Sequence, residues 1–498
     1  MKRNDSLFER AASALSAAAR RHALPIAAAL IFGFLAHMFA FTNKLLNADE
    51  TSALFSKGAT LTSGRWGLEV TRLLFPDVSM PWIYGCVTLL FIAAVVCITI
   101  ECFGFKNRAS QILLSGAFAA FPALTGNICY MFTSASYALA IFLAVLAVFL
   151  FRRGGRARAA VGCVILAFSL GIYQAYIALA ASFCVVLLIQ ELMTENGDAK
   201  SVLRAALRYF LLLAVALVLY YAVTLIVETA MDTGYQEYEV TTELNPLRGL
   251  LTAYTSFFGI FVGGNFGLVT SGAATAAHLA CALIILVSAA AALWRGKDAK
   301  RAALMLVLLV LYPLAVNCMY LIASADIIHT LVLFSFVSFY VLTLVAVEAM
   351  PRRAIRTLCA AALALIIASN VYFANKVYLK MYLEYENGYA FYNSLMAEIM
   401  DNPNFNLFTI VDLVGNVETG LTHFDEEIDT SEFTGVNEDL VNTYTRVSFI
   451  KYYLGIDLYM YREDTILRCD WYEEMPCYPD EGSIKYLPDE NRLVVKLG

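Results

Sequence analysis

Charged residues are scarce in this chain: Asp, Glu, Lys and Arg make up 15% of the 498 residues, against about 25% in soluble globular proteins. Hydrophobic residues make up 60%, and the mean hydropathy is +0.67. A single soluble core cannot bury this excess of apolar side chains, so lipid has to cover part of it. The sequence therefore predicts an integral membrane protein.

Motifs of nucleotide chemistry are also lacking. The sequence contains no P-loop, no G-x-G-x-x-G after a strand and no H-E-x-x-H zinc motif. Ionisable residues are nearly absent from the middle of the apolar runs, whereas ion-coupled transporters usually carry such residues there. These absences argue against an enzyme that binds a nucleotide and weaken the alternative of a transporter.

The net charge of −6 is distributed unevenly. Residues 1–375 carry a net charge of +8, and residues 376–498 carry −14. We therefore predict a transmembrane domain over 1–375 and a small extracytoplasmic α/β domain over 376–498. The acidic second region argues against a nucleic-acid partner, because binding to phosphates requires a basic surface.

Roughly eleven apolar runs are long enough to cross about 30 Å of hydrocarbon. Alternate loops carry 21 Lys and Arg residues and the opposing loops only 5, which predicts a cytoplasmic N-terminus and an extracytoplasmic C-terminal region. The run 159–190 is predicted to turn at Tyr173-Gln174, since only two helices keep its basic flanks on one side. The runs begin near Leu24, Trp82, Ile112, Tyr137, Ala159, Ala175, Tyr209, Thr275, Ala302, Ile327 and Ile355.

Two adjacent carboxylates follow the first span, in the sequence Asn47-Ala48-Asp49-Glu50. At the mouth of a membrane cavity, Asp49 and Glu50 suit a general base with an electrostatic or metal-binding neighbour. The alternative is structural, with Asp49 as the N-cap of a short helix. An acidic pair alone does not distinguish a base from a ligand of a divalent metal such as Mg²⁺ or Mn²⁺.

Ser63-Gly64-Arg65-Trp66-Gly67 lies in the same loop. Arg65 suits bidentate binding of a phosphate, and Trp66 suits stacking on a sugar ring. The flanking glycines would let the backbone approach a ligand closely. The alternative is that the Arg-Trp pair anchors the loop at the membrane interface.

Three further groups carry predictions. Tyr173 and Gln174, at the predicted helix break, either line a binding site or hydrogen-bond a neighbouring helix. His329, in a short outer loop, either binds phosphate or sugar hydroxyls or is an ordinary loop residue. Cys469 and Cys477 lie close together on the oxidising side, where a disulfide is expected, with two free thiols as the alternative.

Taken together, these motifs resemble the bacterial serotype-converting (Gtr-type) membrane glucosyltransferases of the GT-C superfamily. The resemblance rests on the two motifs of the first loop and on Gly171-Ile172-Tyr173-Gln174-Ala175-Tyr176. The ending Met475-Pro476-Cys477-Tyr478-Pro479-Asp480 is similar to a C-terminal block in some members.

The resemblance implies a polytopic α-helical GT-C-like fold in a bacterial inner (plasma) membrane, with the active site in the first outer loop. It implies a polyprenyl-phosphate-linked sugar donor, typically of glucose, and as acceptor a surface glycan such as O-antigen or its lipid-linked precursor. The reaction is then inverting. Alternative functions are a polymerase or ligase of surface polysaccharide, and a flippase or transporter of lipid-linked sugars.

Site residues also follow from the resemblance. Asp49 or Glu50 is the expected base that deprotonates the acceptor hydroxyl. The leaving lipid phosphate needs cationic or hydrogen-bonding partners. The expected partners are Arg65 first, then Lys57, Arg248 and His329, with Tyr173 and Gln174 lining the site nearby.

Overall fold

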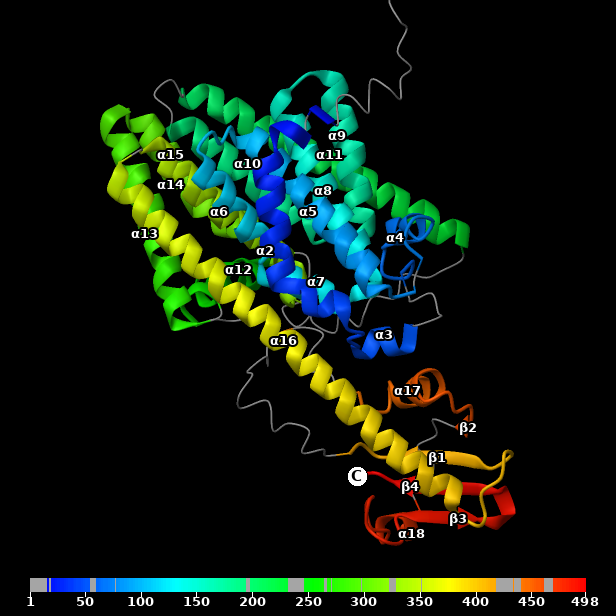
Figure 1. Ribbon diagram of the computed structural model, residues 1–498. Helices are drawn as coiled ribbons and strands as arrows, with labels where there is room; N and C mark the ends of the chain where they lie inside the picture. The colour runs from blue at the N-terminus through cyan, green and yellow to red at the C-terminus, as the bar shows by residue number, and fades with distance from the viewer. Residues whose placement is uncertain are drawn as a thin grey trace, which may run out of the picture.

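The computed structural model of the protein describes residues 16–17, 19–53, 60–76, 78–193, 198–231, 246–263, 267–269, 271–296, 298–321, 328–350, 352–417, 433, 440–460 and 469–498. Most of them are helical, and the elements are labelled in Figure 1. The first half of the chain forms α2 (Ala23–Thr42), α3 (Ala48–Ala53), α4 (Trp66–Thr71), α5 (Pro81–Phe103), α6 (Arg108–Ala119), α7 (Pro122–Cys129), α8 (Met131–Arg153), α9 (Arg156–Ile172), α10 (Tyr176–Met193) and α11 (Ala199–Met231). The second half of the bundle comprises α12 (Pro246–Gly263), α13 (Gly272–Gly296), α14 (Ala299–Val316), η2 (Cys318–Leu321), η4 (Thr330–Val337), α15 (Ser338–Ala349) and α16 (Arg353–Asp401).

Ten helical segments among the described residues are long and apolar enough to span a membrane, which confirms the predicted polytopic helical architecture. The eleventh predicted span is α9, which packs on α8 and α11 but has only 17 residues. Between α9 and α10, the backbone of Tyr173 is extended, with φ −154° and ψ 115°. The predicted turn at Tyr173-Gln174 is therefore present.

Local sequence explains where the helices end. Pro81 opens α5, because the fixed φ of proline suits the first helical position and its missing N–H is not needed there. Gly104 closes the same helix in the left-handed conformation, with φ 74°. Pro122 separates α6 from α7, so one predicted span consists of two short helices in succession.

The longest helix, α16, contains 49 residues and is about 73 Å long at 1.5 Å per residue. It leaves the bundle and carries the C-terminal domain at its end (Figure 1). The domain boundary predicted at 375–376 therefore falls inside a continuous helix and not in a linker. Tyr392, Leu395 and Ile399, in the last part of α16, are buried in a second core that belongs to the C-terminal domain.

The C-terminal domain has a four-stranded mixed sheet with strand order β2-β1-β4-β3. β1 pairs in parallel with β2 and β4, and β3 and β4 form an antiparallel hairpin. Asn491 lies in the turn of this hairpin and adopts the left-handed conformation, with φ 47°. The elements are β1 (Ile410–Val414), α17 (Arg446–Tyr453), β2 (Tyr459–Met460), α18 (Asp470–Glu473), β3 (Ile484–Leu487), η7 (Pro488–Glu490) and β4 (Arg492–Lys496).

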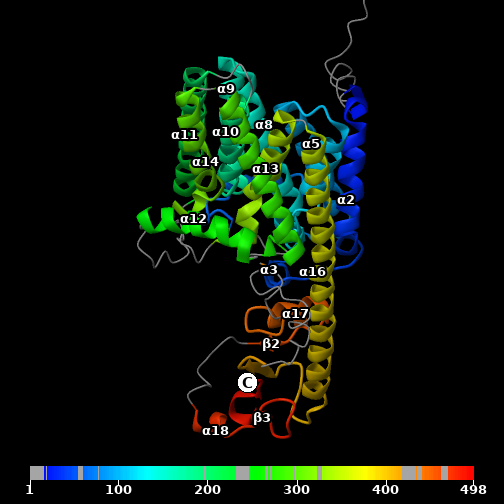
Figure 2. The same cartoon turned by 90° about the vertical axis from the view of Figure 1, so that its left-hand side faces the viewer.

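The end of the bundle that faces the C-terminal domain is here called the C-domain side. α3 lies on this side, between the bundle and α17 (Figure 2). α12 also lies on this side and runs across the ends of the spans (Figure 2). The loop that follows α2 thus occupies the space between the two domains.

Candidate active site

Asn47 fixes the start of α3. Its side-chain oxygen accepts a hydrogen bond from the backbone N–H of Glu50 at 2.8 Å, so Asn47 is the N-cap of this helix. Its side-chain amide donates to the carbonyl of Cys129 at 2.6 Å, at the end of α7. The structural alternative for the acidic pair was therefore wrong, because the cap is Asn47 and not Asp49.

The two adjacent carboxylates have different surroundings. Glu50 is 1% exposed, and its Oε1 accepts a hydrogen bond from Lys44 Nζ at 2.5 Å. Its Oε2 is buried and has no hydrogen-bond partner among the described residues. Asp49 is exposed, and its Oδ1 accepts a hydrogen bond of 3.3 Å from the hydroxyl of Tyr444. Consecutive helical residues point about 100° apart, which separates the two side chains.

The Ser63–Gly67 loop packs on the break between α9 and α10. Gln174 Nε2 donates to the carbonyl of Ser63 at 2.7 Å and to the hydroxyl of Tyr220 at 3.0 Å. The Tyr220 hydroxyl in turn donates to the carbonyl of Gly64 at 3.2 Å. Gln174 therefore connects the first loop with two helices, which bears out its alternative role as an interhelical hydrogen-bonding residue.

Two glycines make this close packing feasible. A Cβ on Gly171 would lie 2.5 Å from the Trp66 ring, and one on Gly67 would lie 2.7 Å from the backbone of Gly171. The Trp66 ring also packs against Phe168, with centroids 5.8 Å apart. We expected the loop glycines to let a ligand approach; for Gly67 this is wrong, because it admits the backbone of α9.

Arg65 projects from this loop onto a tyrosine cluster. Its guanidinium lies 5.0 Å from the centroid of the Tyr173 ring, and its Nη1 donates to the Tyr137 hydroxyl at 3.5 Å. The rings of Tyr137 and Tyr173 are stacked with centroids 4.8 Å apart. The Arg65 guanidinium therefore contacts both of these stacked tyrosines, one through its ring face and the other through its hydroxyl.

His329 belongs to the same cluster. Burial, and secondarily the nearby guanidinium of Arg65, lower the pKa of His329 to about 4, so its imidazole is neutral at pH 7. Nδ1 of His329 is buried and makes no hydrogen bond to any described residue. Arg65 of the first loop and His329 before η4 are far apart in the sequence. The fold thus brings a cation and a neutral imidazole together.

The short helix α7 links the two groups of residues. The carbonyl of Cys129, at its end, accepts the hydrogen bond from Asn47. Two residues earlier, the Asn127 side chain donates to the Tyr176 hydroxyl at 3.4 Å, and the Tyr176 ring packs on Tyr173 at 5.5 Å. The carboxylates and the Arg65 cluster are therefore attached to the same turn of helix on the C-domain side.

The C-terminal domain supplies residues that sequence reasoning missed. α17 packs on α3, and Tyr444, just before α17, donates to Asp49. Burial, and secondarily the Glu50 carboxylate, raise the pKa of the Tyr453 phenol at the end of α17.

The ion pair between Lys44 and Glu50 was also not predicted from the sequence. Only the i, i+6 spacing of these two residues was available as a signal, and it is too weak to predict an ion pair.

Other predicted residues are not brought into this cluster. Lys57 lies outside the described residues. Arg248 is exposed on α12, a helix that packs mainly on η2, α14 and α13. Cys469 and Cys477 are both free, so the structure does not contain the expected disulfide. Cys469 packs against the core around Tyr472, whereas Cys477 is exposed.

A metal centre was left open by the sequence. Within the ranges that the structure describes, no group of three or more His, Cys, Asp or Glu side chains lies close enough together to hold a metal ion. The ammonium of Lys44, 2.5 Å from Glu50, supplies the positive charge next to this buried carboxylate.

The fold and the site define a polytopic membrane protein with a partly buried ion pair, an exposed carboxylate and an arginine–tyrosine cluster on one side of its bundle. The family model of glucosyl transferase GtrII matches residues 38–347, so the chain belongs to this family of membrane glucosyltransferases. The match includes α3, α4, the α9–α10 break and His329. The predicted family is thereby confirmed. No curated protein and no solved structure matches the chain.

Proposed function

We propose that this glycosyltransferase moves glucose from a polyprenyl-phosphate donor to a hydroxyl of a surface glycan or its lipid-linked precursor. The reaction takes place on the extracytoplasmic face of a bacterial inner membrane, which is the C-domain side. The observation that carries the proposal is the exposed Asp49 carboxylate between the bundle and the C-terminal domain. Membership of a glucosyltransferase family supports the sugar and the reaction class.

Asp49 is the proposed general base. It takes the proton of the acceptor hydroxyl while the hydroxyl oxygen attacks the anomeric carbon of the donor. The bond between that carbon and the phosphate oxygen breaks, and the lipid phosphate leaves with the electron pair. One displacement inverts the anomeric configuration, and no covalent sugar intermediate forms.

Glu50 has a different role in this proposal. Its Oε1 is occupied by Lys44 and its side chain is buried, so it cannot reach an acceptor without opening the pair. Its backbone N–H is bound by Asn47, which orients the first turn of α3 and hence Asp49. Glu50 is therefore a positioning residue that holds Lys44 and the loop in place.

Arg65 and His329 are the proposed partners of the leaving phosphate. Arg65 is a permanent cation, and the neutral His329 can donate one hydrogen bond. Both stabilise charge that develops on the phosphate oxygens as the lipid phosphate leaves. Gln174 and Tyr173 position Arg65 through the loop and the ring beneath it.

The reaction class is tested with purified protein in lipid nanodiscs. Polyprenyl-phosphate glucose and UDP-glucose, each radiolabelled, are offered with a lipid-linked surface-glycan acceptor, and the product linkage is read by NMR. The proposal expects transfer from the lipid donor alone and a product anomer opposite to that of the donor. Transfer from UDP-glucose, or retention of configuration, would contradict it.

A further inference from the structure

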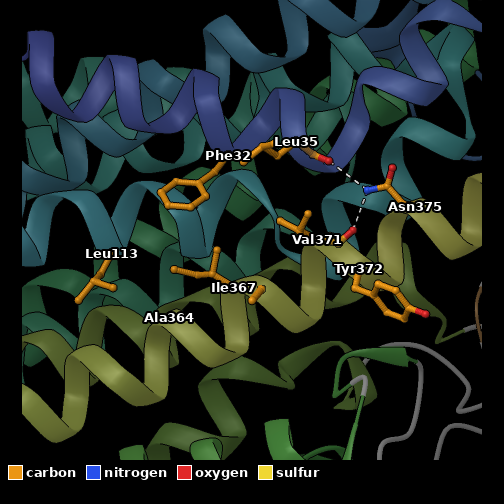
Figure 3. A pocket seen from close by; sticks show the side chains of 9 residues that line it. Phe32, Leu35, Leu113, Ala364, Ile367, Val371, Tyr372 and Asn375 are labelled. Atoms are coloured by element: carbon orange, nitrogen blue, oxygen red, sulfur yellow. Dashed lines mark hydrogen bonds between the residues drawn. The ribbon is translucent and has the colours of Figure 1, made fainter.

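A groove lies between α2 and α16, with α6 contributing to its lining (Figure 3). Its volume is about 510 Å³, within the range of about 300–1,000 Å³ that ligand pockets occupy. Leu35 of α2 and Tyr372 of α16 are 58% and 68% exposed, so the groove opens sideways from the bundle. In a membrane, this opening faces the lipid.

The groove is lined by apolar side chains together with Tyr372 and Asn375. Phe32, Leu113 and Ile367 provide its inner wall. The Asn375 amide donates to the carbonyls of Leu35 at 3.0 Å and Val371 at 2.8 Å, so its hydrogens are already used (Figure 3). A ligand in this groove therefore gains burial of hydrocarbon and no polar contact, which suits an unbranched or methyl-branched apolar chain.

The groove occupies one half of the membrane. Along α16 the lining runs from Ala364 to Asn375, which is about 17 Å at 1.5 Å per residue. Asn375 lies 22 residues after the start of α16, or about 33 Å, which is slightly more than the roughly 30 Å of the hydrocarbon layer. The groove thus reaches the membrane surface on the C-domain side and ends within the bilayer on the other.

A lysine lies next to the surface end of the groove. Lys376 follows Asn375 directly, and its ammonium lies 5.5 Å from the Tyr372 ring. A lysine at this level attracts anionic headgroups to the groove. On the opposite wall, α2 continues from Leu35 to Thr42 and then into the loop that carries Asp49.

We propose that the groove binds the polyprenyl chain of the sugar donor, and that the phosphate end leaves the groove on the C-domain side, past Lys376 and toward the loop that carries Asp49. This inference rests on the proposed function, because it takes the donor to be a polyprenyl phosphate. The apolar walls bind the isoprene units nearest the phosphate, and the end at Ala364 limits how many are held. The chain enters sideways from the lipid, so the donor never leaves the membrane.

Filling the inner end of the groove tests this inference. Ala364→Phe places a ring about 17 Å from the surface end, where a long chain reaches and a ten-carbon chain does not. With polyprenyl-phosphate glucose we expect kcat/KM to fall at least tenfold, and with citronellyl-phosphate glucose we expect no change. Ala290→Phe, at a lipid-exposed alanine of α13 outside the groove, is the matched control and should leave both donors unaffected.

Equal loss or equal retention with both donors would overturn the groove assignment.

A second experiment needs no catalysis: polyprenyl phosphate with a photoreactive isoprene unit is cross-linked to the wild-type protein. The inference expects labelled peptides from α2 and α16, displaced by unlabelled polyprenyl phosphate and not by phosphatidylglycerol. Equal displacement by phosphatidylglycerol would show an ordinary lipid site and contradict the inference. Labelling in the groove without any glucose transfer would contradict the proposed function alone.

Discussion

The ammonium of Lys44 lies 2.5 Å from Oε1 of Glu50, and this ion pair stands directly beside the exposed carboxylate of Asp49. The pair assigns different roles to two acidic residues that are indistinguishable in the sequence. Glu50 has a counter-ion and is buried, whereas Asp49 is exposed and accepts a hydrogen bond from Tyr444 of the C-terminal domain. The consequence is that one carboxylate holds the loop and the other is able to meet a substrate.

Removing Lys44 should destabilise the protein. Lys44→Met leaves the Glu50 carboxylate buried without its cation, which costs 3–5 kcal/mol in fully buried pairs. Because the Lys44 side chain is 32% exposed, we expect a smaller loss, about 2 kcal/mol. The check is thermal unfolding in detergent, where Lys44→Met should unfold at a lower temperature and Lys44→Met/Glu50→Met should recover most of the difference. An unchanged melting temperature in Lys44→Met would show that the pair contributes nothing.

His329 should make stability depend on pH. Its pKa is about 4 in the folded protein and about 6.5 when exposed, so the unfolded chain binds more protons between these values. Stability therefore rises with pH across this window and falls on acidification, by about 2 kcal/mol from pH 7 to pH 4.5. His329→Gln removes this contribution. Unfolding of both proteins at several pH values should show a shallower dependence in the variant, and parallel curves would contradict the buried neutral imidazole.

The contact between Gly171 and Trp66 should tolerate no added methyl group. In Gly171→Ala the new Cβ would lie 2.5 Å from the indole ring, which forces α4 away from α9. Overpacking of this kind costs about 1–3 kcal/mol, and the shift of Arg65 should lower kcat/KM as well. Gly272→Ala is the control, since nothing lies within 4 Å of its added Cβ. Stability and transfer are measured for both, and equal behaviour would refute the tight contact.

Chelation of metal ions should leave transfer unchanged. Lys44 already neutralises Glu50, so the site contains one exposed carboxylate, Asp49, and a divalent ion usually needs more oxygen ligands than one side chain provides. We expect the same initial rate with and without EDTA when the donor is supplied in purified form. A rate that falls with EDTA and returns with Mg²⁺ or Mn²⁺ would assign Asp49 to a metal.

Much of the fold was predictable from sequence because lipid imposes length and polarity on each span. The break at Tyr173-Gln174 followed from loop charge, since one long helix would have reversed the side of the next basic cluster. The span count differs in one element because α9 is unusually short. The predicted boundary at 375–376 lies where the net charge of the chain changes sign. The charge pattern does not reveal that α16 continues without a break across this position.

The sequence pointed to some residues of the candidate site, but not to their geometry. Residue types marked Asp49, Glu50, Arg65 and His329, whereas contacts that the sequence does not reveal decided what each of them faces. The Tyr444 hydroxyl lies on Asp49 across 395 positions, and no local pattern contains this information. By residue type, Trp66 could have stacked on a sugar ring or anchored the loop at the membrane interface. In the structure its ring packs on Phe168 and Gly171.

The most direct test of the account is the single-turnover rate of glucose transfer in Asp49→Asn, with donor and acceptor bound at saturation. Asp480→Asn, an exposed carboxylate change in the C-terminal domain, is the matched control. Loss of a general base lowers the chemical step by about 10²–10⁴-fold, so Asp49→Asn should fall by at least 100-fold while donor binding stays near wild type. A wild-type single-turnover rate in Asp49→Asn would contradict the assignment of Asp49 as the base.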